Sequence, residues 1–236
     1  MFDCVEVTGC CGGRRTGMCG ITGLWNAGSV DEDTSRGWLE RMADTLVHRG
    51  PDGAGVFFDR EAGLGFAHRR LSILDLSERG QQPMRSHSGR TTITYNGEVY
   101  NAPEIRAALD RDGWRAAWRG HSDTEVVLEA IEAWGLEAAL ERFDGMFAFA
   151  VWDRERDELH LARDRFGVKP LYYSETPDGF FVFASEAKAI LGQVPATRQF
   201  DEQGLAEYLS CGCPLQNRTL FQGIELLPAG SGVHTR

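Results

Sequence analysis

Residues 18–25, MCGITGLW, place the thiol of Cys19 directly before an apolar run that is typical of a β-strand. A cysteine in this position is more often a small buried side chain than a nucleophile. As a nucleophile it needs a nearby base, and an α-amine, with a pKa of about 7.7–8.0, suits that role. A peptide nitrogen does not, because its lone pair is delocalised into the carbonyl. The chemistry of this stretch therefore depends on whether Cys19 becomes the first residue.

Residues 1–17, MFDCVEVTGCCGGRRTG, stand before Met18 and lack the apolar segment of a secretory signal. We expect them to be an extension, either a propeptide or the product of a start assigned upstream of Met18. We expect residues 18–236 to form one domain.

The 236-residue chain has the composition of an ordinary globular protein, with 42% hydrophobic and 25% charged residues. Its net charge of −10 argues against nucleic-acid and anionic-membrane partners, both of which attract basic surfaces. No apolar run is long enough to span a membrane. These properties predict a cytoplasmic protein.

The six cysteines are expected to be reduced in such a chain. Cys10, Cys11, Cys211 and Cys213 could be drawn together, but their spacing is poor for a tetrahedral zinc site. No metal site is therefore predicted, and a metal-binding protein is the weakest of three functional hypotheses.

The hydrophobic pattern predicts an α+β domain with mostly antiparallel strands, because short turns join the strands and there are few helices. Strands are expected over residues 21–25, 55–59, 64–74, 91–95, 146–152, 158–164, 170–174 and 180–185. Helices are expected over residues 35–46, 102–110, 122–135 and 201–210.

Two helix starts carry capping signals. Asn101 precedes the helix over residues 102–110 and is expected to cap it. Ser122 and Glu125 match the S-x-x-E capping box, and Gly135 is placed to end the helix that they begin.

Several polar groups suit the binding of a free amino acid with a side-chain amide. Arg69 or Arg70 would bind its carboxylate, and Asp123 would pair with its ammonium. When a thiolate attacks the amide, Asn96 offers a side-chain N–H to the oxyanion, and Gly97 offers a backbone N–H with no Cβ to block approach. Each residue also has a structural interpretation: a solvated arginine, a helix-dipole aspartate and an Asn-Gly hairpin turn.

The surroundings of Asn96-Gly97 argue against the hairpin, because the residues that follow lead into a helix rather than a strand. A loop with another role is therefore predicted there.

Nine ordered motifs resemble the glutaminase half of the glutamine-hydrolysing asparagine synthetases, which belong to the class II glutamine amidotransferases. The resemblance runs from Met18 to about Val233. The motifs are MCGITGLW, HRGPDG, RLSILD, NGEVYN, SDTE, GMFAFAVWD, RDRFGVKPLYY, SEAKAI and GIELLPAG. The resemblance implies an N-terminal-nucleophile hydrolase fold, a four-layer αββα sandwich with two antiparallel sheets.

The same resemblance implies the site residues. The catalytic residues would be Cys19, Asn96 and Gly97. The residues that bind L-glutamine would be Arg70, Leu71, Ile73, Asn96, Gly97, Glu98 and Asp123, with Arg70 on the carboxylate and Glu98 and Asp123 on the amino end.

The implied reaction is hydrolysis of L-glutamine to L-glutamate and ammonia through a γ-glutamyl thioester, with no cofactor. In the family, ammonia passes to a synthetase domain that activates aspartate with ATP and magnesium. No pyrophosphate-binding loop of the SGG-x-D-S type occurs in this sequence, so asparagine synthesis would need a separate synthetase domain or subunit. A homo-oligomer is compatible with the sequence. The second hypothesis, if residues 1–17 are retained, is a non-catalytic glutamine-binding or regulatory partner module.

Overall fold

The computed structural model describes residues 18–25, 31–71, 80–176, 179–193 and 198–235. Six strands form sheet A, and their bounds are β1 (Gly20–Trp25), β2 (Gly53–Asp59), β3 (Leu64–Arg70), β8 (Tyr172–Glu175), β9 (Phe181–Ala184) and β10 (Glu225–Leu226). The strand order is β10-β8-β9-β1-β3-β2, and every neighbouring pair is antiparallel.

Five strands form sheet B, and their bounds are β4 (Met84–Arg85), β5 (Thr91–Val99), β6 (Gly145–Asp153), β7 (Glu158–Arg163) and β11 (Gly232–Thr235). Their order is β11-β7-β6-β5-β4, again antiparallel throughout. The prediction of antiparallel sheets is confirmed.

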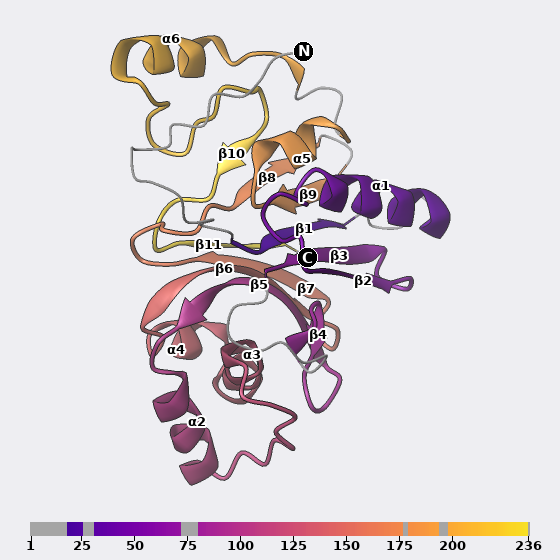
Figure 1. Cartoon of the computed structure of the whole chain (residues 1–236), viewed down its shortest axis with the longest axis vertical. Helices are drawn as coiled ribbons and strands as arrows, with labels where there is room; N and C mark the ends of the chain where they lie inside the picture. Colours follow the sequence, from indigo (N-terminus) through magenta and orange to yellow (C-terminus); the bar gives the residue numbers. More distant parts are fainter. Residues whose placement is uncertain (1–17, 26–30, 72–79, 177–178, 194–197, 236) are drawn as a thin grey trace.

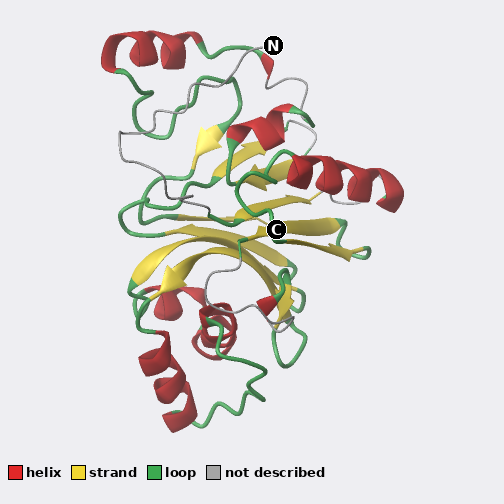
Figure 2. Cartoon of the chain, in the orientation of Figure 1, coloured by secondary structure: helices red, strands yellow, loops and turns green. Residues whose placement is uncertain are grey.

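The two sheets stack face to face between layers of helices (Figures 1 and 2). Helices α1 (Glu32–Asp44) and α5 (Ala187–Leu191) cover the outer face of sheet A. Helices α2 (Ala102–Arg111), α3 (Asp123–Trp134) and α4 (Leu136–Leu140) cover sheet B. Helix α6 (Glu202–Cys211) lies apart from both layers, at the top of Figure 1. This arrangement confirms the expected αββα sandwich.

The core between the sheets is built from alternate residues of each strand. Ile21, Phe66, Trp152, Leu161 and Phe183 are fully or almost fully buried there. Each such side chain contributes about 1.5–3 kcal/mol by leaving water. The period of two in the strands therefore fixes which side chains face the space between the sheets.

The predicted loop at Asn96-Gly97 is wrong, because β5 runs straight through both residues. Asn96 pairs with Ala148 of β6, and Gly97 pairs with Phe147. A Cβ added at Gly97 would lie 2.4 Å from the carbonyl oxygen of Met146 and 2.6 Å from Cβ of Phe147. The glycine is thus required by the close approach of β6 rather than by a turn.

The two helix starts differ from each other. At α3, Ser122 accepts a hydrogen bond from the N–H of Thr124 at 3.2 Å, which confirms it as the N-cap. Glu125 does not complete the capping box, because its carboxylate accepts from the N–H groups of Arg119 at 2.8 Å and Gly120 at 3.1 Å.

At α2, Asn101 occupies the N-cap position but makes no capping hydrogen bond. Its side chain instead donates to the carbonyl oxygen of Arg142 at 2.8 Å and accepts from the N–H of Asp144 at 3.0 Å. Asn101 therefore does not cap α2 as predicted, and its side chain instead links the start of α2 to the residues just before β6. Gly135 ends α3 as expected, with φ of 83°.

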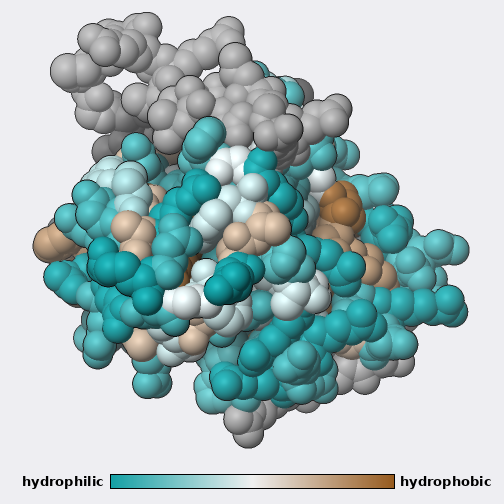
Figure 3. Space-filling view, turned by 90° about the horizontal axis from the view of Figure 1, so that it is seen from below, coloured by the Kyte–Doolittle hydropathy of each residue, from teal (hydrophilic) through white to brown (hydrophobic). Residues whose placement is uncertain are grey.

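The side that carries α2, α3 and α4 presents mostly hydrophilic residues, with small and separate hydrophobic patches (Figure 3). Among the helices of the described residues, none combines the length and apolarity needed to cross a membrane.

Candidate active site

Cys19 lies immediately before β1, and the pairing of Gly20 with Arg69 places it beside the end of β3. The N–H of Leu71 approaches the Cys19 Sγ at 3.4 Å. Ile21 faces the core between the sheets, so the alternation of side chains along β1 turns Cys19 toward the same space. The structure thus brings Cys19 and Leu71 together as predicted.

Burial dominates the electrostatics of the Cys19 thiol and raises its pKa above the ordinary value. The Leu71 N–H and the charges of Arg70, Arg49 and Lys169 act in the opposite direction, because they favour the thiolate. The thiolate is the nucleophilic form of cysteine. The buried thiol therefore needs a base or additional positive charge before it can react at neutral pH.

The two arginines of β3 serve different faces of the strand, as their alternation predicts. Arg69 donates to the carbonyl oxygen of Ala43 at 3.1 Å and forms an ion pair with Asp44, so it holds the end of α1. Arg70 points to the opposite face, and its charge acts on Cys19. Arg70 therefore lies on the same side of β3 as Cys19, and its role on a substrate carboxylate stays a prediction.

Asn96 faces the space between the sheets, because its partner Ala148 has its side chain in that core. Asn96 is only 2% exposed, and its Nδ2 has no hydrogen-bond partner among the described residues. A buried donor left unpaired costs about 1–3 kcal/mol, so such donors are rare without a function. Its amide is thus available to an oxygen atom of a ligand.

The backbone N–H of Gly97 points away from β6. Along β5, the N–H of Tyr95 donates to Oε1 of Gln82 at 2.6 Å, and the N–H of Val99 donates to Oδ2 of Asp123 at 3.0 Å. Alternate residues of a strand direct their N–H groups to the same side. The Gly97 N–H therefore emerges at the same edge, between the side chains of Gln82 and Asp123.

Asp123 is held at this edge of β5 by three donors. Besides Val99, the Tyr95 hydroxyl donates to it at 2.8 Å and the Thr124 N–H at 2.9 Å. Burial, followed by the charges of Asp123 and Glu98, raises the pKa of Tyr95 well above its ordinary value, so the hydroxyl stays protonated as a donor. Asp123 and Glu98 thus both act on the Tyr95 hydroxyl, and their shared role at the substrate's amino end stays a prediction. Tyr95 was missed by sequence reasoning, which treated it only as a strand residue.

Arg49 is a second residue that the sequence analysis did not single out, although it lies in the HRGPDG motif. Its Nε donates to the carbonyl oxygen of Cys19 at 3.2 Å, and its Nη1 lies 3.0 Å from Glu186. Glu186 also binds Nε2 of His48 at 2.8 Å and Nζ of Lys188 at 2.9 Å. Arg49 therefore holds the backbone of Cys19, the candidate nucleophile, through its carbonyl oxygen.

Two predictions fall partly beyond the described residues. Ile73, expected to line the glutamine pocket, lies outside them, as do residues 1–17 with Cys10 and Cys11. Cys211 and Cys213 are both exposed. Within the part of the chain that the structure describes, no group of three or more His, Cys, Asp or Glu side chains is arranged to hold a metal.

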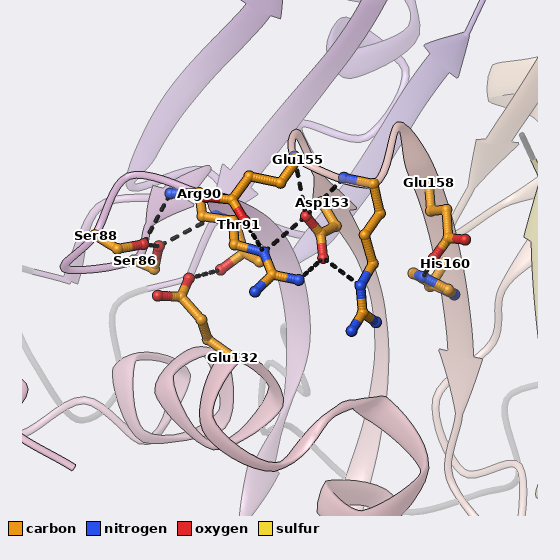
Figure 4. Close-up of polar contacts among 10 residues, drawn as sticks. Ser86, Ser88, Arg90, Thr91, Glu132, Asp153, Glu155, Glu158 and His160 are labelled. Atoms are coloured by element: carbon orange, nitrogen blue, oxygen red, sulfur yellow. Dashed lines mark hydrogen bonds and ion pairs between the residues drawn. The ribbon is translucent and has the colours of Figure 1, made fainter.

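A separate hollow of about 810 Å³ lies on the outer face of sheet B, between α3–α4 and β7–β11. Figure 4 shows its polar side chains. The pairs there are Arg90 with Asp153, Thr91 with Glu132 and Glu158 with His160. Because these groups bind one another, the hollow offers less to a substrate than the space around Cys19.

Residues 18–236 match the model of the glutamine amidotransferase domain family. The chain belongs to this family. It is 40% identical over 216 residues to asparagine synthetase [glutamine-hydrolyzing] 3 of Bacillus subtilis (strain 168), an alignment that covers 90% of this chain and 34% of the relative. This glutamine amidotransferase domain therefore spans about a third of the length of that relative.

Solved structures show the same fold for this glutamine amidotransferase domain. The allosteric regulatory enzyme of purine biosynthesis superimposes with a TM-score of 0.66 and 19% identity, over 92% of this chain and 46% of that one. The glutamine phosphoribosylpyrophosphate amidotransferase of B. subtilis gives 0.59 and 19%, over 92% and 49%. The expected N-terminal-nucleophile hydrolase fold is confirmed.

Proposed function

We propose that the protein hydrolyses L-glutamine to L-glutamate and ammonia. The observation that carries this proposal is the buried, unpaired Nδ2 of Asn96, which faces the same space as the Cys19 thiol. An N–H group that has no hydrogen-bond partner and lies beside a candidate nucleophile suits a reaction in which an oxyanion forms. Membership of the glutamine amidotransferase domain family supports the same chemistry.

The reaction proceeds in two steps. The Cys19 thiolate attacks the side-chain carbonyl carbon of glutamine, and the oxygen becomes an oxyanion that the N–H groups of Asn96 and Gly97 stabilise. Collapse of this intermediate breaks the C–N bond, and the nitrogen leaves as ammonia after it gains a proton. Water then attacks the γ-glutamyl thioester, which releases glutamate and restores the thiol.

The substrate is held at both ends in this proposal. Arg70 binds the α-carboxylate, and Glu98 and Asp123 receive the ammonium. Leu71 borders the pocket beside Cys19, and Ile73 is proposed to line it. The Tyr95 hydroxyl keeps Asp123 in place for this contact.

The base in this mechanism is the α-amine of Cys19, so the active form begins at Cys19. Burial raises the pKa of the thiol, and a peptide bond to Met18 would leave the nitrogen without a usable lone pair. Residues 1–17 are thus proposed to be an extension, either a propeptide or the product of an upstream start. If they are retained, the second candidate is a non-catalytic module that binds glutamine or a partner.

The test combines intact mass with turnover. The full reading frame is expressed, its mass is measured, and release of glutamate from L-glutamine is assayed beside Cys19→Ala. We expect a mass that begins at Cys19, and loss of turnover in Cys19→Ala with unchanged folding. Cys211→Ala, which removes an exposed thiol, is the matched control and should keep full activity. Turnover that survives in Cys19→Ala would refute the mechanism.

We further propose that the ammonia serves ATP-dependent synthesis of asparagine from aspartate. The support is the 40% identity to a glutamine-hydrolysing asparagine synthetase. The ATP and magnesium would be bound by a synthetase domain or a separate subunit in the cytoplasm, while the glutaminase step needs no cofactor. Asparagine formed from glutamine, aspartate and ATP when this protein is mixed with a synthetase domain would support the proposal, and its absence would count against it.

A further inference from the structure

Two motifs of the sequence, HRGPDG at residues 48–53 and SEAKAI at residues 185–190, have no part in the proposed reaction. The structure brings them together, because Nη1 of Arg49 lies 3.0 Å from Oε1 of Glu186. The Nε2 of His48 lies 2.8 Å from the same oxygen. The two motifs thus form one polar cluster, and Arg49 connects it to the Cys19 carbonyl.

The second motif also holds the backbone of β1 directly. The N–H of Ile21 donates to Oγ of Ser185 at 3.0 Å, and the N–H of Ser185 donates to the carbonyl oxygen of Ile21 at 2.9 Å. Ser185 is fully buried. Because Ser185 is fixed in this way, Glu186 beside it has a defined position relative to the start of β1.

The first motif lies against the end of β3. A Cβ added at Gly50 would lie 2.3 Å from the carbonyl oxygen of Arg69, so only glycine lets the loop approach this closely. The N–H of Asp52 donates to the carbonyl oxygen of Arg70 at 3.0 Å. These contacts hold the loop, and with it Arg49, at the end of β3 beside Cys19.

Arg49 connects Glu186 to Cys19. It is only 8% exposed, and its Nε donates to the carbonyl oxygen of Cys19 at 3.2 Å while Nη1 donates to Glu186 at 3.0 Å. A guanidinium is planar and rigid, so the contact at Nη1 sets the direction of the N–H at Nε. A buried charge is normally paired with an opposite one, and Glu186 supplies that partner.

Glu186 is well placed to remain anionic. Burial by itself would raise the pKa of Glu186, but the hydrogen bonds of Lys188, Arg49 and His48 hold it below its ordinary value. The side chains of Lys188 and His48 are 44% and 43% exposed, so these two partners lie on the solvent side of the carboxylate. Arg49 is the partner through which the carboxylate reaches Cys19.

We propose that Glu186 is a positioning residue that acts through Arg49 and holds the backbone of Cys19 for reaction. The inference rests on the proposed function, because it takes Cys19 as the nucleophile and its α-amine as the base. The first residue of a chain has no preceding peptide bond, so its carbonyl oxygen and side chain must hold it. Arg49 binds the carbonyl, and the Leu71 N–H approaches Sγ at 3.4 Å. Glu186 thus keeps the thiol and the amine in the geometry that attack requires.

The first test is steady-state kinetics of the chain that begins at Cys19. Glu186→Ala should lower kcat for glutamine hydrolysis about tenfold to hundredfold and change KM by less than about twofold, because Glu186 does not contact the substrate. Glu186→Gln keeps an oxygen for Arg49 and should recover most of kcat. Lys188→Met removes an exposed partner of the same carboxylate and should match the wild type. Unchanged kcat in folded Glu186→Ala would overturn the proposal.

A double-mutant cycle tests whether Glu186 acts through Arg49. Arg49→Lys and Glu186→Ala are measured alone and together. Residues that act as one unit give non-additive losses, so the second substitution should reduce kcat little beyond the first. Losses that multiply would show that Glu186 acts independently of Arg49 and would contradict the proposal.

A third measurement needs no turnover and therefore separates this proposal from the proposed function. In a chain with labelled arginine, the Nε–H NMR signal that disappears in Arg49→Lys belongs to Arg49. Its exchange with water should be slow in the wild type and in Lys188→Met, and fast in Glu186→Ala. Glu186→Gln, with intermediate exchange expected, serves if Glu186→Ala does not fold. Absence of glutamine hydrolysis in the wild type would refute the proposed function, whereas slow exchange that survives the loss of Glu186 would refute its positioning role.

Discussion

Two regions of the molecule gather polar side chains, and they differ in whether those side chains are satisfied. Between the sheets, Nδ2 of Asn96, Nε2 of His68 and Nε1 of Trp152 are buried without a partner among the described residues, and so is Nη2 of Arg49 beside the Cys19 carbonyl. On the outer face of sheet B, Arg90 and Asp153 bind each other at 2.9 Å, and their neighbours are paired in the same way (Figure 4).

The difference shows that volume alone does not locate a site. The outer hollow has a volume of about 810 Å³, but its charged side chains pair with one another. The space around Cys19 holds buried donor atoms, Nδ2 of Asn96 among them, that have no partner among the described residues. Unpaired buried groups are costly, so their concentration in one place is a stronger sign of function than a cavity.

The largest effect expected from this comparison is at the unpaired amide of Asn96. Asn96→Ala removes a donor to the oxyanion, so kcat for glutamine hydrolysis should fall about 10²–10³-fold with little change in stability. The matched control is Asn101→Ala, whose amide is bonded to Arg142 and Asp144. It should lose about 1 kcal/mol of unfolding free energy and keep kcat. Equal kcat values in Asn96→Ala and Asn101→Ala would show that the unpaired amide of Asn96 has no special role in the reaction.

His68 should make the protein sensitive to acid. Burial lowers its pKa to about 4, so between pH 6.5 and 4 the unfolded chain takes up a proton that the folded chain refuses. The free energy of unfolding should therefore decrease by up to roughly 3 kcal/mol as the pH is lowered from 6.5 to 4. Urea unfolding at pH 7 and pH 4.5 measures the loss, and His68→Gln should flatten it. An equal decline in the variant would show that other groups cause it.

Tyr95→Phe should sharpen the comparison at the substrate end. Loss of the hydroxyl removes one donor from Asp123, so KM for glutamine should rise about tenfold while kcat changes less. Tyr173 is the matched control, because its hydroxyl donates to Glu225 on the surface at 2.8 Å. Steady-state kinetics should show no change of KM in Tyr173→Phe. If Tyr95→Phe has the same KM as Tyr173→Phe, Tyr95 does not contribute to glutamine binding.

The smallest effect is expected in the outer hollow. Asp153→Asn weakens its pairing with Arg90 and should cost about 1–2 kcal/mol at pH 7, with glutamine hydrolysis unchanged. Burial by itself would raise the pKa of Asp153, but the hydrogen bonds and charge of Arg90, together with the N–H groups of Arg156 and Glu155, hold it below its ordinary value. The stabilisation is therefore present above about pH 4 and is lost as pH falls through the lowered pKa. The gap between the variant and the wild type should close in acid, and reduced turnover at pH 7 would show that the hollow contributes to function.

The sequence predicted long elements well and local contacts less well. Strands such as β6 and β7 were found because each is a run of six or more residues with the composition typical of a strand. The short strands β4, β10 and β11 were missed, because their two to four residues carry no recognisable period and lack the aromatic residues that marked the equally short β8 and β9. Asn96-Gly97 was mistaken for a loop because the reason for the glycine lies in Met146 and Phe147, about fifty residues away.

The residues of the candidate site also divide into those that a local sequence pattern reveals and those that depend on distant contacts. Cys19, Asn96 and Asp123 could be proposed because each lies in a motif with its own chemistry. Arg49 and Glu186 could not, because their meaning comes from neighbours across the fold. Arg49 contacts a carbonyl 30 residues away, and Glu186 binds Arg49 over a separation of 137 residues.

Asp164 is a buried carboxylate that joins β6 to the turn after β7. Its carboxylate accepts the N–H of Phe147 at 3.2 Å, and its own N–H donates to the Phe147 carbonyl at 2.8 Å. Phe147 is the partner of Gly97, and the same carboxylate fixes the turn of Lys169. The strand pair that carries Gly97 and the turn that carries Lys169 are therefore tied to one buried carboxylate, so a change at residue 164 would disturb both.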